Sequence, residues 1–290
     1  MDIEDLRTFV EVADAGGVTP AAFRLGISKS MVSRRLARLE ADLGAQLLSR
    51  TTRGTALTEA GTTFRDYAAR ISAELDAARE TILPAGTLRG RLRVAAPLSF
   101  GPTHFAPVLA KMARDHPQLH VQSCYTDRIV DIVSEGFDCA IRVGYLQDSS
   151  LIARRVGPIH GKLLASPDYI KMYGSPETPD ELLNHQALLH DTETWDVTDG
   201  DRIITTRPRG RFKADNAVAL VAAALAGIGI ARVPNGLADE HIASEALVEV
   251  MKRYPPPPGG IFIIRPPGQH PARKVRVLIE MLLACFDSGE

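Results

Sequence analysis

One short stretch of the sequence carries basic and hydroxyl side chains at a spacing that suits hydrogen bonding to base edges. Residues 19–40 read as two short helices joined by a tight turn at Gly26. A helix can enter a DNA major groove when one face carries long cations between short hydroxyls. On the second helix that face is predicted to consist of Lys29, Ser30, Ser33, Arg34 and Ala37. Ser28 is also expected at the groove, and Thr19 on the DNA backbone.

Capping residues delimit the two predicted helices. The Thr19 hydroxyl is expected to cap the first helix, with Pro20 at its first position, and Ser28 to cap the second. The second helix also carries an apolar stripe at i, i+4 and i+7, made by Val32, Leu36 and Leu39. The stripe faces the core, so the basic face points elsewhere.

The positive charge of this stretch is local. Residues 24–53 hold seven Lys and Arg against two acids, whereas the whole chain has a net charge of −1. Such an imbalance is typical of a surface that meets DNA phosphates. The alternative is an ordinary solvated helix. Arg35 and Arg38 point to a third side, where a purely structural role is the simpler interpretation.

The predicted helices have a brace before them and a wing after them. Residues 3–15 form an amphipathic helix that packs against the pair, and residues 50–58 form a two-stranded wing that turns at Arg53-Gly54. Arg50 and Arg53 are predicted to lie along phosphates or in the minor groove. A solvated hairpin tip is the alternative.

A long helix is predicted from Thr58 to about Leu83. Its apolar residues recur every three or four positions, about 3.7 on average, which favours a nearly straight pairing with a second helix. Since this stripe has no domain of its own to cover, we expect it to dimerise. The stripe consists of Ala60, Phe64, Tyr67, Ile71, Leu75, Ala78 and Ile82, and Pro84-Ala85-Gly86 forms a hinge.

The remainder of the chain alternates predicted strands and helices. This pattern predicts parallel sheets covered by helices. The first set includes a strand at 88–97, a helix at 103–117, a strand at 119–127, a helix at 129–136 and a strand at 138–144. A second set follows, with a hairpin at Asp199-Gly200, a helix at 216–227 and a strand at 228–233, and a helix at 272–286 closes the chain.

The N-terminal segment LRTFVEVADAGGVTPAAFRLGISKSMVSRRLARLEADLGAQLLSRTTRGTALTEAG resembles the LysR-type transcriptional regulators almost position by position. PLSFGPTHFAPVLAKMARDHP, TDRIVDIVSEGFDCAIRVG, DSSLIARRVG and ASPDYI extend the likeness over nearly the whole chain. The resemblance implies a multidomain protein with a winged helix-turn-helix domain, a long linker helix and an α/β, two-lobed C-terminal domain similar to type 2 periplasmic binding proteins. It also implies homodimers or homotetramers that bind operator DNA and respond to a small-molecule effector.

Domain limits follow from this resemblance. We expect a DNA-binding domain at 1–58, a linker at 59–87 and an effector domain at 88–290. Its lobes would be 88–161 with 267–290, and 162–266, so that the chain crosses between them near Gly161 and near Arg265-Pro266. The sequence departs from the family at Lys29, where glutamine is more common, and at Leu48, where phenylalanine is. Lysine reads guanine acceptors or a phosphate instead of adenine, which shifts the expected operator preference.

An effector site is expected where strands of the first lobe end near helix N-termini. Polar groups there favour a small anion such as a carboxylate. Alternatively, Arg142 pairs with Asp127 or Asp138, Ser99 and Thr126 are ordinary caps, and Trp195 either lines the cleft or anchors the surface. The candidate effector-binding residues are Ser99, Phe100, Thr126, Arg142 and Asp215.

Other functions find little support in the sequence. No GxSxG, Walker, HExxH or CxxC motif is present, so we expect no enzyme, cofactor or metal. A solute-binding protein, the second alternative, lacks the DNA-binding segment and would carry an export signal. We expect a cytoplasmic protein without a membrane span, with RNA polymerase as a candidate partner. Cys124 and Cys139 are interpreted as reduced thiols, with a redox pair as the alternative.

Overall fold

The computed structural model describes residues 1–51, 54–82, 88–146, 150–190, 194–267 and 271–287. The chain divides into two compact units. The first comprises residues 1–87 together with 131–136 and 268–276, and the second comprises 88–130, 137–267 and 277–290.

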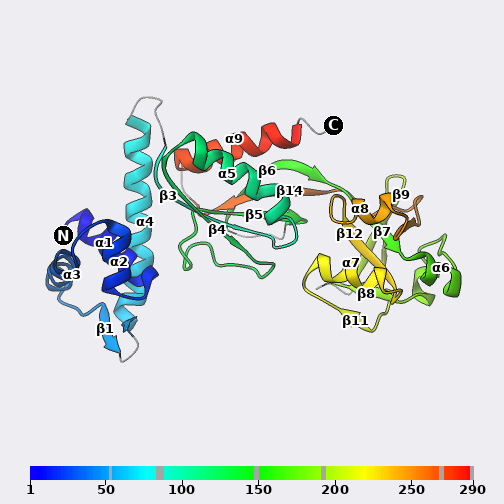
Figure 1. Cartoon of the computed structure of the whole chain (residues 1–290), viewed down its shortest axis with the longest axis horizontal. Helices are drawn as coiled ribbons and strands as arrows, with labels where there is room; N and C mark the ends of the chain where they lie inside the picture. The colour runs from blue at the N-terminus through cyan, green and yellow to red at the C-terminus, as the bar shows by residue number, and fades with distance from the viewer. Residues whose placement is uncertain (52–53, 83–87, 147–149, 191–193, 268–270, 288–290) are drawn as a thin grey trace. The chain divides into compact units, whose positions relative to one another are not determined.

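The N-terminal part of the first unit is a winged helix-turn-helix followed by a long helix (Figure 1). Three helices pack around a core that includes Phe9, Val32, Leu36 and Leu39. The elements are α1 (Ile3–Ala15), α2 (Val18–Leu25), α3 (Lys29–Leu43), β1 (Leu48–Thr51), β2 (Gly54–Leu57) and α4 (Glu59–Ile82). The brace, wing and long helix predicted from the sequence are therefore confirmed.

One predicted cap is wrong and one is confirmed. The α2 helix begins at Val18 behind Gly17, with no side-chain cap, so Thr19 lies inside the first turn. Ser28 does cap α3, because its Oγ accepts a hydrogen bond from the Met31 N–H at 3.2 Å. Gly26 ends α2 with φ +64°, a conformation that glycine adopts without steric cost.

The beginning of α4 is packed on the three-helix core. The rings of Phe64 and Phe9 lie 5.7 Å apart, and Arg65 forms a 2.6 Å ion pair with Asp14 of α1. Gly61 approaches the wing so closely that a Cβ there would lie 1.9 Å from the Leu47 carbonyl oxygen. This position therefore admits no side chain without movement of the backbone.

The first sheet of the second unit has the strand order β4-β3-β5-β14-β6. Phe105, at the end of a π-helical turn, packs its ring 6.3 Å from Phe286 of the C-terminal helix. The elements are β3 (Arg89–Ala96), the turn (Gly101–Phe105), α5 (Ala106–Asp115), β4 (Gln118–Tyr125), β5 (Cys139–Gly144), β6 (Ile152–Ile159), β14 (Gly259–Arg265) and α9 (Arg273–Asp287).

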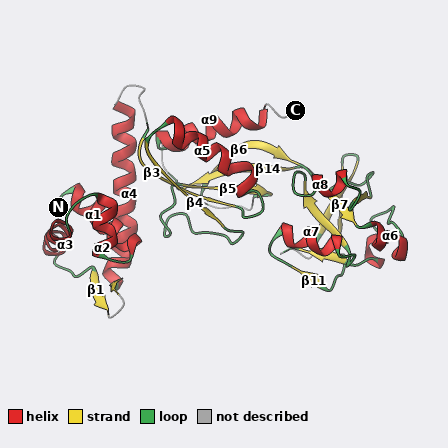
Figure 2. Ribbon diagram, in the orientation of Figure 1, coloured by secondary structure: helices red, strands yellow, loops and turns green. Residues whose placement is uncertain are grey.

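The second sheet has the order β11-β8-β12-β7-β13, and Figure 2 shows the short helices around its strands. Trp195 is buried in its core, so neither of the two roles left open for this residue applies. The elements are β7 (Gly161–Ala165), α6 (Pro167–Tyr173), a 3₁₀ turn (Glu181–Asn184), β8 (Ala187–Leu189), the hairpin β9 (Trp195–Asp199) and β10 (Arg202–Thr206), β11 (Phe212–Lys213), α7 (Ala217–Leu225), β12 (Ile230–Pro234), α8 (Asp239–Ala243) and β13 (Val248–Val250).

Both sheets are mixed, whereas the sequence predicted parallel ones. In the first sheet, β14 runs antiparallel to β5 and β6. The strand that follows the second lobe thus returns to the first sheet, and the crossing lies before Gly259, not near Arg265-Pro266 as predicted. The other crossing, near Gly161, is confirmed because β6 and β7 belong to different sheets.

The prediction of a helix at 129–136 is wrong, because this segment forms turns. The Asp131 carboxylate accepts hydrogen bonds from the N–H groups of Val133 and Ser134, and Glu135 accepts one from the Asp131 N–H. These side chains satisfy backbone donors locally and thereby compete with the helical ladder. The short helix α8 was not predicted.

A redox pair of Cys124 and Cys139 is incompatible with the sheet. Cys124 lies opposite Ala95 and Cys139 opposite Val94, on the two strands that flank β3. The two side chains therefore point to opposite faces and stand two strand spacings apart, about 10 Å. A disulfide needs Cα atoms within about 7 Å.

We predict that Gly61→Ala destabilises the DNA-binding domain by about 1–3 kcal/mol, because the new methyl group overlaps the Leu47 carbonyl. Thermal unfolding of the full chain measures the effect. Thr62→Ala, at an exposed neighbouring position, is the control. Equal melting temperatures for Gly61→Ala and wild type would contradict the close packing of α4 on the wing.

Candidate nucleic-acid interface and effector site

The predicted basic face of α3 is exposed. Lys29, Ser30, Ser33 and Arg34 all lie at the surface, whereas Val32, Leu36 and Leu39 are buried on the opposite side of the helix. The Ser28 and Ser30 hydroxyls lie 2.9 Å apart at the start of the helix. The face is thus accessible to a partner as large as a DNA duplex.

Three arginines of this region are held by acids of α1. Arg38 binds the fully buried Asp5 with two hydrogen bonds of 2.6 Å, from Nε and from Nη2. The hydrogen bond with Asp5 raises the pKa of Arg38 above its usual value. In the same way Arg35 contacts the Glu4 carboxylate at 3.4 Å and Arg24 contacts the Glu11 carboxylate at 3.2 Å. The structural role predicted for Arg35 and Arg38 is confirmed.

Lys29 and Arg34 differ from these three arginines. Within the described parts of the chain, no hydrogen bond or ion pair engages either side chain. The excess charge of the region is therefore not spread evenly over its surface. Two unengaged cations remain on the outward face of α3, beside the hydroxyls of Ser30 and Ser33.

The remaining predicted DNA contacts are Thr19, Ser28, Arg50 and Arg53. Thr19 is exposed in the first turn of α2, and Ser28 already uses its Oγ to cap α3. Arg50 lies in β1 opposite Thr55 of β2. The Arg50 side chain and all of Arg53 lie outside the described residues.

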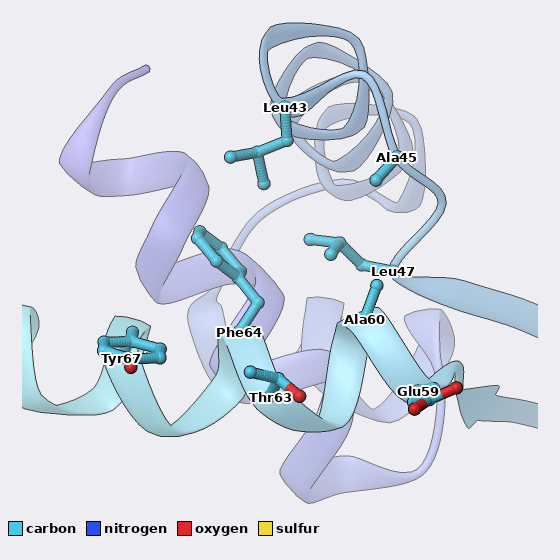
Figure 3. Close-up of a pocket in the computed structure, with 8 residues that line it drawn as sticks. All are labelled: Leu43, Ala45, Leu47, Glu59, Ala60, Thr63, Phe64 and Tyr67. Atoms are coloured by element: carbon cyan, nitrogen blue, oxygen red, sulfur yellow. The ribbon is translucent and has the colours of Figure 1, made fainter.

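A groove of about 600 Å³ lies between the end of α3 and the start of α4 (Figure 3). Phe64, Leu43 and Leu47 form its apolar walls, with Tyr67 and Glu59 along α4. Tyr67 and, one turn further, Ile71 are 54% and 44% exposed. Sequence periodicity placed both on the dimerisation stripe, and this part of the stripe is uncovered in the single chain, whereas Phe64 of the same stripe packs on Phe9.

In the second unit, a side-chain hydrogen bond connects the loops that follow strands of the two sheets. The Asn216 Nδ2 donates to Asp127 Oδ2 at 2.6 Å, while the Leu98 N–H donates to Asp127 Oδ1 at 2.9 Å. The Tyr145 hydroxyl donates to the Pro257 carbonyl. We call this region the inter-lobe edge; it is defined by Asp127, Arg142, Tyr145, Asn216 and Pro257.

Arg142 lies at this edge, and among the described residues it forms no ion pair with Asp127 or Asp138, the two partners that the sequence left open. Its Nη1 contacts the Arg128 carbonyl at 3.4 Å, and its buried Nη2 has no hydrogen-bond partner among the described residues. Burial lowers the pKa of Arg142, although the nearby Asp127 acts in the opposite direction. Asp138 is engaged elsewhere, since it accepts from the Arg93 N–H at 2.7 Å. Arg142 is thus a partly desolvated cation with an unused donor.

The remaining effector candidates divide into two groups. Ser99 and Thr126 are half-buried at the same end of the first sheet, and the Thr126 hydroxyl accepts from the Arg128 N–H at 3.4 Å. Phe100, by contrast, is buried and packs on His104, so it contributes to the core. Asp215 is exposed to solvent.

Asn216 is the polar residue that sequence reasoning missed in this loop. Its Oδ1 caps α7 by accepting from Val218 and Ala219, and its amide nitrogen reaches Asp127. An asparagine directly before an apolar helix is itself a capping signal. That signal would have selected Asn216 over Asp215.

No cluster of three metal-ligating side chains occurs among the described residues. In the same part of the chain, no helix is both long enough and apolar enough to cross a bilayer.

A winged helix-turn-helix with an exposed basic recognition helix, joined to a two-sheet α/β domain, defines a DNA-binding transcriptional regulator with an effector-binding domain. Residues 3–62 match the family of bacterial regulatory helix-turn-helix proteins of the lysR type, and residues 85–286 match the LysR substrate binding domain. The chain belongs to the LysR family of transcriptional regulators.

Relatives span nearly the full length of the chain. The transcriptional regulator PtxR of Pseudomonas aeruginosa is 34% identical over 97% of this chain and 92% of its own. The virulence activator AphB of Vibrio cholerae has a similar structure, with a TM-score of 0.59, 27% identity and coverage of 99% and 100% of the two chains. For CrgA of Neisseria meningitidis the TM-score is 0.56 at 28% identity, covering 99% and 97%.

We predict that Asp5→Asn lowers the melting temperature and weakens DNA binding, because a neutral amide cannot accept both hydrogen bonds of Arg38. Differential scanning calorimetry and a gel shift measure the two effects. Asp42→Asn is the matched control, since Asp42 is 39% exposed and pairs with the N-terminal amine. A melting temperature for Asp5→Asn equal to that of the control would contradict the account.

Proposed function

We propose that the chain binds operator DNA through the outward face of α3, with Lys29, Ser30, Ser33 and Arg34 at the major groove and Thr19, Arg50 and Arg53 on the backbone. Ser28 orients the start of the helix and completes the set. The observation that supports this proposal is a difference between the cations of this region. Acids of α1 form ion pairs with Arg24, Arg35 and Arg38, whereas Lys29 and Arg34 form none within the described residues.

The chemistry of the two available cations suits base recognition. A guanidinium reaches guanine O6 and N7 in bidentate fashion, and a lysine reaches the same acceptors. Serine hydroxyls contact bases or phosphates without blocking the approach of the helix. Phosphate contacts add affinity that falls steeply with salt, so the affinity for operator DNA depends on ionic strength.

The second unit senses an anionic effector at the inter-lobe edge. Arg142 supplies the charge, and Ser99 and Thr126 supply hydroxyls beside it. The unused Nη2 of Arg142 supports this assignment, because a buried donor on a cation is costly unless an acceptor meets it. In the free protein, the Asp127 carboxylate stands nearby and bridges to Asn216.

The protein assembles through α4. Tyr67 and Ile71 expose large apolar surfaces beside the groove of Figure 3, and a second copy of the same helix covers them. The resulting homodimer presents two recognition helices to one operator, and pairs of dimers make the homotetramer. The protein acts in the cytoplasm as a regulator without enzymatic activity, and RNA polymerase is its candidate partner at the promoter.

Arg34→Ala tests the DNA interface. We expect it to weaken binding to the DNA that flanks the protein's own gene by about 1–3 kcal/mol, and to weaken binding to random DNA less, because a base contact is lost. Gel shifts at fixed salt measure both affinities. Arg24→Ala removes the same charge from an arginine paired with Glu11 and serves as control. If operator affinity is unchanged in a folded Arg34→Ala protein, the proposed interface is wrong.

Ile71→Glu tests the assembly. A charge on the apolar stripe should convert dimers to monomers, since burying an unpaired carboxylate at the interface is unfavourable. Light scattering after size-exclusion chromatography gives the mass. Thr62→Glu, on the exposed side of the same helix, should stay dimeric. A dimer that survives Ile71→Glu unchanged excludes this face as the interface.

Arg142→Ala tests the effector site. In a thermal-shift screen of carboxylate metabolites, we expect compounds that raise the melting temperature of the wild type to lose this effect on the variant. The mutation deletes the charge but not Ser99 or Thr126, so a residual shift is compatible with the site. Equal stabilisation of both proteins would show that Arg142 does not contact the ligand.

A further inference from the structure

A run of exposed cations lies at one edge of the second sheet. Arg207, Arg209, Arg211 and Lys213 occupy every second position of a stretch that contains no acid, although the whole chain has a net charge of −1. All four residues are exposed. We call these four residues the basic edge. They lead into and include β11 (Phe212–Lys213), which is the outermost strand of the order β11-β8-β12-β7-β13 (Figure 1).

The backbone of the basic edge is fixed on β8. The Ala187 N–H donates to the Arg209 carbonyl at 2.8 Å, and the Ala214 N–H donates to the Leu189 carbonyl at 3.0 Å. Gly210 approaches β8 so closely that a Cβ there would lie 1.7 Å from the Ala187 carbonyl oxygen. The cations therefore extend from a backbone that the sheet holds in place.

The residues between the cations face the protein interior. Pro208 is buried, and Phe212 packs against the core cluster that includes Leu220 and Ala224 of α7. Within the described ranges, no hydrogen bond or ion pair engages the side chain of any cation of the basic edge. The segment thus presents positive charge to solvent and keeps its apolar side chains inside.

Protection of the sheet edge is the simplest alternative role for these charges. Charged side chains on an edge strand oppose pairing with the sheet of another molecule. That role does not depend on the sign of the charge, and β13 at the other end of the same sheet carries an acid, Glu249. Edge protection therefore does not explain why all four charges of the basic edge are positive, whereas an anionic partner does.

The chemistry of the basic edge favours a nucleic-acid backbone over a protein as that partner. Protein interfaces are centred on buried apolar anchors, and the basic edge turns its apolar residues inward. Arginine and lysine are common ligands of phosphate oxygens. The four cations extend over at most about 20 Å of chain, and duplex DNA carries one charge per about 1.7 Å of axis. Such a surface meets several phosphates at any register.

We propose that the basic edge is a second DNA-contacting surface, which binds the phosphate backbone of duplex DNA without reading its sequence. This surface belongs to the effector-binding domain, so the inference goes beyond the contacts proposed for α3 and the wing. The two surfaces have different tasks. The outward face of α3 selects the site, and the basic edge adds affinity that depends on salt but not on sequence.

The test is the salt dependence of DNA binding by the full chain. Fluorescence anisotropy titrations at several salt concentrations would use the duplex that flanks the protein's own gene and a random duplex of equal length. The glutamine variant combines Arg207→Gln, Arg209→Gln and Arg211→Gln, and the lysine variant replaces the same three residues by lysine. The matched control removes three other exposed cations of the same unit by Arg154→Gln, Lys171→Gln and Lys252→Gln.

Each phosphate contact that is lost makes the slope of log affinity against log salt shallower by about 0.9. We expect the glutamine variant to lose about 2 to 3 in slope on both duplexes. Between 50 and 200 mM salt, the wild type should therefore lose roughly 15- to 40-fold more affinity than this variant. The control should keep the wild-type slope, and so should the lysine variant, because lysine retains a charge that binds phosphate.

Several outcomes would overturn the inference. A glutamine variant with the affinity and slope of the wild type would assign the basic edge to edge protection or to an acidic protein. A control that loses as much slope would show a general effect of charge. A lysine variant that binds as weakly as the glutamine variant, or a glutamine variant that melts clearly below the wild type, would indicate a structural role for the three arginines.

This inference and the proposed α3 interface can fail separately. Arg34→Ala is expected to lower the ratio of operator affinity to random-DNA affinity, because a base contact is lost. The glutamine variant is expected to lower both affinities and to leave that ratio unchanged. A normal response to Arg34→Ala together with an unaffected glutamine variant would retain the α3 interface and reject the basic edge.

Discussion

The contact between Arg38 and the buried carboxylate of Asp5 sets the orientation of the recognition helix. A fully buried carboxylate is unfavourable without a cation, and here both of its oxygens accept charge-assisted hydrogen bonds from one guanidinium. With Arg38 turned to α1 and Leu39 in the core, the helix cannot rotate about its axis. Lys29 and Arg34 are therefore left facing outward. The same interaction that stabilises the domain thus determines which cations stay available at the surface for the proposed DNA contact.

Charged side chains have different surroundings in the two units. In the DNA-binding domain, acids of α1 neutralise the arginines that must stay in place, and the outward face keeps its charge in water. At the inter-lobe edge, Arg142 is partly desolvated, and the nearby carboxylate of Asp127 is engaged by Asn216. The first arrangement suits a polyanion that approaches from solvent. The second suits a small anion that enters between two lobes.

Local signals predicted the helix-turn-helix well, because the caps, the i, i+4 stripe and Gly26 are all encoded within a few residues. Thr19 was misassigned because a helix can start on Gly17 without a side-chain cap. The wrong predictions after residue 88 have two causes, one local and one of longer range. The segment at 129–136 has helical periodicity, yet Asp131 and Glu135 close turns instead. The position of β14 in the first sheet and the core position of Phe100 depend on contacts distant in sequence, whereas the capping role of Asn216 could have been predicted locally.

The orientation of α3 is tested most directly by site-specific photocrosslinking. Benzoylphenylalanine would be incorporated in place of Ser33, on the outward face, or in place of Met31, which is exposed on the other side of the same helix. The complex with DNA flanking the protein's own gene would then be irradiated. We predict crosslinks to bases within the protected site from position 33 and little or none from position 31. Crosslinks from position 31 with none from position 33 would contradict the account, because the DNA would then lie against a different side of the helix.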